Sequence, residues 1–171
     1  MKVFFDATVW CGALLRPTQI NAQLLALAAQ GGPLRGFTSD VVLLEFYRHA
    51  VDGTLGRPYD AEDVWDLVLA HEPLLEIEQA PIGRSLPQRS DLHNLPLNEI
   101  VYHLTGESRE DLLDELGDRR TLAEFDANDL HVLAAAVRSD ADAICSSDGV
   151  FEPVGHVSIY RPGQLAAEYG L

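Results

Sequence analysis

Five acidic residues stand at positions where strands are expected to end or helices to begin. Asp6 and Asp148 each follow a short apolar run of the kind that forms a buried strand. Glu45, Asp126 and Asp129 lie early in segments with the apolar pattern of helices. Strand carboxyl ends and helix amino ends share one rim of a parallel α/β sheet, so these acids are expected to converge there.

Carboxylates that converge in this way need positive charge, because like charges raise one another's pKa. Oxygen ligands without His or Cys favour Mg²⁺ or Mn²⁺ over zinc. Such ions activate water and stabilise charge on the attacking and leaving oxygens of a phosphodiester. The pattern therefore predicts metal-assisted phosphodiester hydrolysis, with five candidate ligands: Asp6, Glu45, Asp126, Asp129 and Asp148.

Each acid also has a simpler structural interpretation. Asp6 or Thr8 could cap the helix that follows the first strand. Asp129 could cap the alanine-rich helix after it, and Asp148 could be a turn residue. Glu45 could be an exposed helical glutamate. These alternatives remain open at the level of single residues.

The elements that must position the acids alternate between strands and helices. Strands are expected at the first apolar run and at 34–38, 74–77, 141–146 and 157–160. Helices are expected at about 9–30 and at 41–49, 60–69, 97–104, 107–116, 130–137 and 164–169. Gly31, Gly32 and Pro33 end the first helix. This alternation predicts an α/β fold: a parallel β-sheet flanked by helices on both faces, an α/β/α sandwich.

The charge balance limits the kind of nucleic-acid contact that is expected. Asp and Glu number 27 and Lys and Arg 12, a net charge of −15, which argues against a broad basic face. A bound divalent ion would supply positive charge locally. Arg84 and Arg89, in a proline-containing loop at 79–95, are the candidates for phosphate contacts, with a plain solvated loop as the alternative.

Length and apolar runs indicate a single domain, 1–171, in the cytoplasm. No apolar run reaches the roughly 20 residues of a membrane span, and the start lacks the order of a signal peptide. Cys11 and Cys145 lie in apolar surroundings without the spacing of a zinc site. Both are expected to be reduced, buried thiols.

Four segments, in this order, resemble the PIN-domain nucleases, a family that includes the toxins of VapBC toxin–antitoxin systems. They are residues 3–8 (VFFDAT), 39–45 (SDVVLLE), 126–136 (DANDLHVLAAA) and 143–151 (AICSSDGVF). The resemblance covers both ends of the chain well and the middle poorly. The segment at about 52–124 is longer than in compact toxins, so it is expected to be an extended helical and loop region for specificity or partner binding.

The resemblance assigns a role to most of the candidate residues. It implies that the acidic metal-site residues are Asp6, Glu45, Asp129 and Asp148. It also implies that Thr8 and Ser146 occupy the supporting hydroxyl positions. Asp126 competes with Asp129 for the third acid; the spacing to the alanine run favours Asp129, and Asp126 remains a candidate supporting or second-metal ligand.

The function implied by the resemblance is Mg²⁺- or Mn²⁺-dependent cleavage of RNA by the toxin of a type II toxin–antitoxin system. A small antitoxin protein is the implied partner, and a homodimer is a candidate assembly. The alternatives are a nuclease outside such systems and a PIN fold kept as a non-catalytic interaction module. Phosphoryl-accepting folds are disfavoured, because no second acid follows Asp6 at their spacing and Lys2 is the only lysine.

Overall fold

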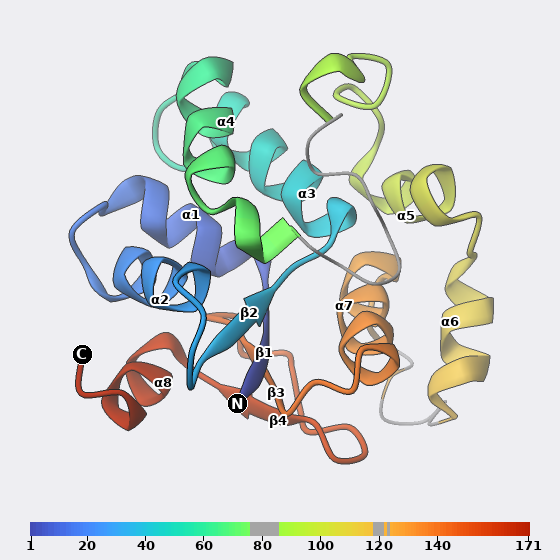
Figure 1. Ribbon diagram of the computed structural model, residues 1–171. Coiled ribbons are helices and arrows are strands. Elements are labelled where there is room, and N and C mark those ends of the chain that lie inside the picture. Colours follow the sequence, from blue (N-terminus) through green and yellow to red (C-terminus); the bar gives the residue numbers. More distant parts are fainter. Residues whose placement is uncertain (76–85, 118–121, 123) are drawn as a thin grey trace.

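A four-stranded sheet, with every strand parallel to its neighbours, forms the centre of the fold (Figure 1). The computed structural model describes residues 1–75, 86–117, 122 and 124–171. The strands lie in the order β2-β1-β3-β4. Their bounds are Lys2–Phe5 for β1, Arg35–Phe37 for β2, Ala143–Cys145 for β3 and Ser158–Tyr160 for β4.

The first strand is central because it is apolar on both faces. Val3, Phe4 and Phe5 are fully buried, as is typical of a parallel sheet covered on both sides. Phe4 pairs with Phe37 on one side and with Ile144 on the other. The end of β1 therefore lies in the middle of the rim where the strands end.

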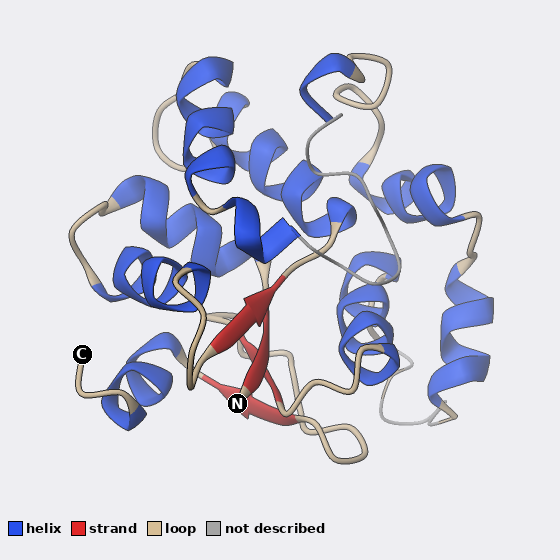
Figure 2. Ribbon diagram, in the orientation of Figure 1, coloured by secondary structure: helices blue, strands red, loops and turns tan. Residues whose placement is uncertain are grey.

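Eight α-helices in the described residues surround the sheet (Figure 2). Figure 1 shows α1, α2 and α8 on one side of the sheet and α5, α6 and α7 on the other. The predicted α/β class and parallel sheet are confirmed. The helix bounds are Ala7–Leu15 for α1, Ile20–Ala29 for α2, Asp40–Val51 for α3, Ala61–Ala70 for α4, Leu97–Thr105 for α5, Arg109–Leu116 for α6, Ala127–Arg138 for α7 and Pro162–Glu168 for α8.

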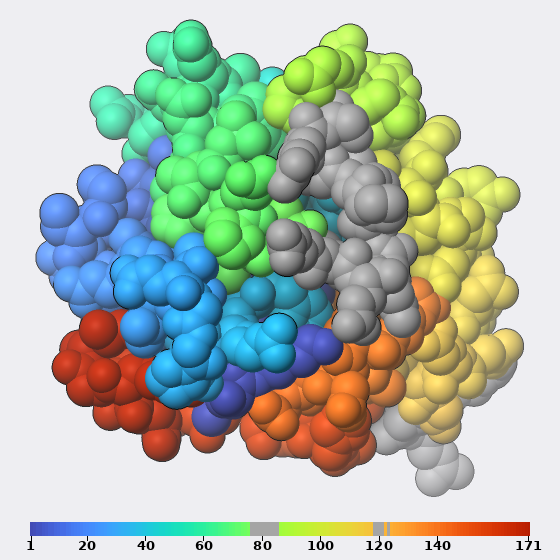
Figure 3. All heavy atoms as spheres, viewed as in Figure 1, coloured from blue at the N-terminus to red at the C-terminus, as the bar shows by residue number. Residues whose placement is uncertain are grey.

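The N-terminal and C-terminal parts of the chain pack against each other. The C-terminal helix α8 packs against α2, and the space-filling view places the two segments side by side (Figure 3). The alanine-rich α7 contacts β1, β3 and three other helices, and its Ala134 and Ala136 are fully buried. Small side chains allow this close approach on several sides.

Two predicted elements are wrong. The single helix at about 9–30 is two helices, because the chain leaves the helical conformation around Pro17. The strand at 74–77 is wrong at Leu74 and Leu75, which belong to a 3₁₀ helix, Glu72–Leu75, while 76–77 lie outside the described residues. A short apolar run does not by itself distinguish a strand from a buried helical turn.

The other predicted elements are present, with their ends shifted by a few residues. The predicted loop at 79–95 lies partly outside the described residues, and its described part includes a short 3₁₀ helix, Leu86–Gln88. A capping box begins α6, with Ser108 and Asp111 bonded reciprocally. Among the described helices, none combines the length and apolar character needed to cross a membrane.

Candidate functional site

Asp6 lies directly after β1 and is 6% exposed. Its Oδ2 accepts hydrogen bonds from Thr8 Oγ1 at 2.9 Å and from Ser146 Oγ at 2.7 Å. Asp6 is also the N-cap of α1, since Oδ2 accepts from the Thr8 backbone N–H at 3.4 Å. The capping role considered for Asp6 is therefore present, and the same carboxylate contacts the end of β3.

The hydroxyls of Thr8 and Ser146 connect Asp6 to the loop that carries Asp148. Ser146 is fully buried, and its Oγ accepts from the Asp148 N–H at 2.9 Å. Thr8 Oγ1 accepts from the Ser147 N–H at 2.8 Å. Asp148 is exposed and accepts from the Val150 N–H at 3.0 Å, so the turn role considered for it is also present.

Glu45 lies in the second turn of α3, and its side chain is 23% exposed. Burial raises its pKa, the nearby His49 lowers it, and the charges of Asp6 and Asp126 raise it. His49 Nε2 lies 3.5 Å from Glu45 Oε1, one helical turn away. Glu45 is thus a partly buried acid within electrostatic range of two other predicted site residues.

The start of α7 presents two acids with different local roles. Asp126 is the N-cap and accepts from the backbone N–H groups of Asn128 at 2.9 Å and Asp129 at 3.0 Å. The alternative in which Asp129 caps this helix is therefore wrong. Asp129 lies in the first turn, and burial raises its pKa to about 7. The further causes of the raised pKa are the charges of the other four acids: Asp126, Glu45, Asp148 and Asp6.

Asp129 is thus within electrostatic range of the other four predicted carboxylates. Their donor atoms are all hard oxygens, a type that suits Mg²⁺ or Mn²⁺. Among the described residues, no three His, Cys, Asp or Glu side chains form a group arranged to hold a metal ion. Two properties make these carboxylates suitable for a metal ion: their donor atoms are oxygens, and a bound cation would offset the repulsion between their charges.

The two predicted phosphate contacts do not join this group. Arg84 lies outside the described residues. Arg89 is exposed, and its Nε lies 3.1 Å from Asp91 Oδ1 in a surface ion pair. Sequence reasoning missed Arg161, which follows β4 and donates to the Ser147 carbonyl oxygen beside Asp148. Arg161 could have been found by the rule that selected Asp6, because it is the first residue after a strand.

Sequence reasoning also missed a buried acid outside the five predicted carboxylates. Asp40, the first residue of α3, is 2% exposed, and neither carboxylate oxygen has a hydrogen-bond partner. Burial raises its pKa to about 7. Its neighbour Ser39 caps α3 and lies 3.2 Å from His131 Nε2, and burial lowers the pKa of His131 to about 4.

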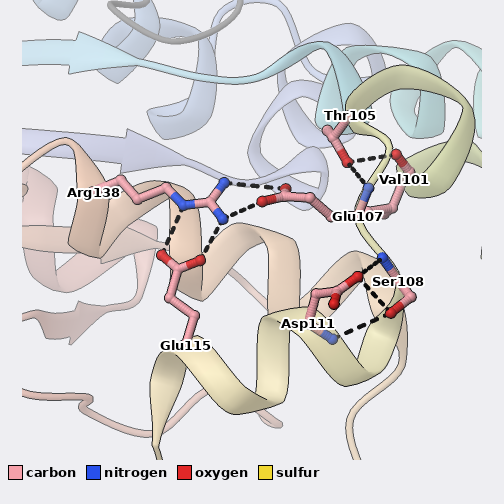
Figure 4. Close-up of polar contacts among 7 residues, drawn as sticks. All are labelled: Val101, Thr105, Glu107, Ser108, Asp111, Glu115 and Arg138. Carbon is pink, nitrogen blue, oxygen red and sulfur yellow. Dashed lines mark hydrogen bonds and ion pairs between the residues drawn. The ribbon is translucent and has the colours of Figure 1, made fainter.

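An ion-pair network holds α6 and the segment before it against the end of α7 (Figure 4). Arg138 Nε donates to Glu115 Oε1 at 2.7 Å, and its Nη1 donates to Glu107 Oε2 at 3.1 Å. The guanidinium lowers the pKa of Glu107. The helix that carries Asp129 at one end is thereby anchored at the other.

Two cavities are lined in part by predicted site residues. One, of about 300 Å³, is mostly apolar and lies beside Thr8, Glu45 and Cys11. The other, of about 580 Å³, lies beside Asp126 and is lined by α5, α6 and the start of α7. Cys11 and Cys145 are both buried and unpaired, as predicted, and burial raises the pKa of each thiol to about 12.

Comparison with known proteins gives no relative for this arrangement. No protein-family model matches the chain, and neither a curated protein nor a solved structure matches it.

Proposed function

We propose that this protein is a metal-dependent endoribonuclease with a PIN-like α/β/α fold. The observation that carries the proposal is that Asp6, at the end of the central strand, is hydrogen-bonded to Thr8 and Ser146, and that Ser146 also binds the backbone of Asp148. Mg²⁺ or Mn²⁺, when bound, would activate water and stabilise charge on the phosphodiester oxygens. Five carboxylates would hold the metal: Asp6, Glu45, Asp126, Asp129 and Asp148.

The remaining residues of the site orient these carboxylates. Thr8 and Ser146 hold Asp6 through one oxygen, and Ser146 also binds the backbone of Asp148. His49 contacts Glu45 from the next turn of α3. Such fixed donors limit the rearrangement needed when a charged substrate arrives.

The cost of the carboxylate group favours catalysis over a purely structural role. Burying ionisable groups near like charges is unfavourable. The pKa of Asp129 is raised because of such burial and such charges. A non-catalytic interaction module has no use for this arrangement. RNA as the substrate, and a toxin role with a small antitoxin partner, are supported by the resemblance to PIN-domain nucleases in four segments of the sequence.

A cleavage assay tests the nuclease proposal. We expect wild-type protein to cleave single-stranded or structured RNA with Mn²⁺ and not with EDTA. Asp6→Asn should abolish cleavage, whereas Asp66→Asn, an exposed acid on α4, should not change it. Equal cleavage by the Asp6→Asn variant and the wild type, with both folded by circular dichroism, would sink the proposal.

The toxin role is tested separately by expression in a bacterial host. Growth arrest that Asp148→Asn abolishes, and rescue by a small protein encoded in the adjacent reading frame, would support it. Metal-dependent RNA cleavage without growth arrest would instead indicate a nuclease outside toxin–antitoxin systems.

A further inference from the structure

The cavity beside Asp126 has no role in the proposed chemistry. It has a volume of about 580 Å³ and lies between α5, α6 and the start of α7. These three helices lie next to one another in Figure 1. Asp126 lines the cavity, and its carboxylate accepts from the Asp129 N–H at 3.0 Å, so the cavity adjoins the start of α7 where Asp129 lies.

An unusually exposed aromatic side chain lines this cavity. Tyr102, on α5, is 62% exposed, the highest value among the exposed large hydrophobic residues of the described chain. The core does not cover its ring, which lies edge-on to the neighbouring His103 ring with 6.5 Å between the ring centroids. Exposed aromatic rings next to a nucleic-acid site are platforms on which unpaired bases stack.

The polar lining suits an uncharged base better than a phosphate. Glu107, Glu124 and Asp126 all line the cavity and would repel a phosphate. Carboxylates can accept hydrogen bonds from the amino groups of bases, as Glu and Asp do from cytosine. Glu107 is already paired with Arg138, whereas Glu124 is exposed beside Asp126.

An arginine lines the same cavity close to the start of α7. Arg109 lines the cavity, and its Nε donates to the Phe125 carbonyl oxygen at 2.9 Å, one residue before Asp126. Its Nη1 also lies 3.5 Å from Glu110 Oε1. Arg109 thus gives the cavity lining a cation beside its acids.

We propose that this cavity binds one unpaired base of single-stranded RNA, stacked on Tyr102, and so directs the adjacent phosphodiester to the carboxylates. The proposal rests on the nuclease function proposed above. It explains how a chain with a net charge of −15 can hold RNA without a basic face. A base with an exocyclic amino group, such as cytosine, should bind better than uracil.

The test compares binding and cleavage in four full-length proteins: wild type, Tyr102→Ala, Tyr102→Phe and Leu69→Ala. Leu69 is 48% exposed on α4 and serves as the matched surface control. Binding of labelled oligocytidine, oligouridine and an RNA duplex is measured by fluorescence anisotropy with Mn²⁺, each protein also carrying Asp129→Asn so that the RNA stays intact. KM and kcat are measured without that substitution.

Tyr102→Ala should weaken binding of oligocytidine and raise KM, each about tenfold, as expected for the loss of one stacked base, with a smaller change in kcat. Tyr102→Phe keeps the ring and should restore most of the affinity. Oligouridine should bind more weakly than oligocytidine, and binding of the duplex should not depend on Tyr102. Leu69→Ala should match the wild type.

Each other outcome has a distinct meaning. Cleavage by the wild type with no effect of Tyr102→Ala overturns the base-binding proposal and leaves the nuclease proposal standing. An equal loss in Tyr102→Phe and Tyr102→Ala overturns stacking, because the hydroxyl would then be responsible. Tyr102-dependent binding without cleavage by the wild type overturns the nuclease instead. If the wild type neither binds nor cleaves RNA, the base-binding proposal and the nuclease proposal are both overturned.

Discussion

Asp6 is held by hydroxyls that come from two different parts of the chain. Thr8 donates to it from the first turn of α1, and Ser146 donates from the end of β3. Hydrogen bonds to a charged acceptor are about twice as strong as those between neutral groups. The two hydroxyls therefore fix the orientation of the Asp6 carboxylate. Ser146 Oγ also accepts from the Asp148 N–H, which positions the backbone of Asp148 relative to Asp6.

At the residue scale, neutralising Asp129 should separate activity from stability. Asp129→Asn should lower the rate of RNA cleavage at least about 100-fold, as expected for the loss of a preorganised electrostatic group. At pH 8, above the folded pKa of about 7, the wild-type residue is charged and repelled by its neighbours. The variant should therefore be slightly more stable in EDTA, by at most about 1 kcal/mol because solvent screens the partly exposed site.

Urea denaturation of both proteins in EDTA and in Mn²⁺ provides the measurement. Mn²⁺ should stabilise the wild type more than the Asp129→Asn variant, since binding to the folded state adds stability. Equal stabilisation of the two proteins by Mn²⁺ would exclude Asp129 as a ligand.

Asp40 makes a pH-dependent contribution to stability. Its folded pKa of about 7 exceeds the ordinary value of 3.8, so the folded state holds a proton that the unfolded state releases. Stability is then lost as the pH rises from about 4 to 7. Asp40→Asn removes this loss, and its advantage over the wild type should grow by about 2–3 kcal/mol between pH 5 and pH 8.

Urea denaturation at the two pH values measures the Asp40 effect, with Asp66→Asn as the exposed control. The control variant should differ from the wild type by the same small amount at both pH values. A difference for Asp40→Asn that stays constant with pH would contradict the buried, unpaired carboxyl described above.

At the scale of elements, the position of α7 matters most, because it links the sheet to the helices that line the larger cavity. It contacts β1 and β3 on one side and α5 and α6 on the other. Close approach elsewhere depends on small residues: a Cβ on Gly36 of β2 would lie 2.7 Å from the Ala28 Cβ and 2.5 Å from Leu74 Cδ2. Ion pairs rather than small residues secure the outer face of α7.

Replacing Arg138 should loosen α6 from α7 without changing the core. Arg138→Met keeps much of the aliphatic side chain but removes both ion pairs, and should cost about 1 kcal/mol at pH 7 because the pairs are partly exposed. Glu107 has a lowered pKa, so its contribution is lost as the pH falls through that value. The difference between variant and wild type should therefore shrink in acid.

Hydrogen exchange at the backbone of α6 gives the most direct measurement of this loosening. Relative to the wild type, the Arg138→Met variant should show a larger increase in the exchange rate in α6 than in β1. Unchanged exchange in α6 would mean that apolar packing alone holds the helix.

At the scale of the whole molecule, the net negative charge distinguishes this protein from nucleic-acid-binding proteins that contact the phosphate backbone through a basic surface. The net charge is −15, and at least three of the described arginines, Arg89, Arg109 and Arg138, are paired with carboxylates. The excess of negative charge disfavours a binding mode that depends on many phosphate contacts. We therefore expect any affinity for RNA to come from the local site and from contacts to bases.

Binding of single-stranded RNA should accordingly depend little on salt. Between 50 and 200 mM NaCl, at constant Mn²⁺, we expect affinity to fall by less than about threefold, because fewer than about one phosphate is neutralised by side chains. Fluorescence anisotropy at several salt concentrations measures the slope. A fall of about 100-fold would show that several phosphates are bound by basic side chains.

The sequence by itself determined the fold class and most of the elements, though not their exact ends, because apolar periodicity and capping residues act locally. Ser108 with Asp111 at the start of α6, and the buried β1, are examples. The same local logic placed acids after strands and at helix starts. It failed at Pro17, where one predicted helix is two, and at Leu74, where a buried turn resembled a strand.

Only the tertiary structure decided how side chains from distant segments meet. It made Asp126 rather than Asp129 the cap of α7, left Arg89 in a surface pair, and put Arg161 beside the loop of Asp148. It also brought Tyr102 into a cavity shared with Asp126. Such contacts depend on how elements pack across the whole chain, and periodicity within one element carries no record of that packing.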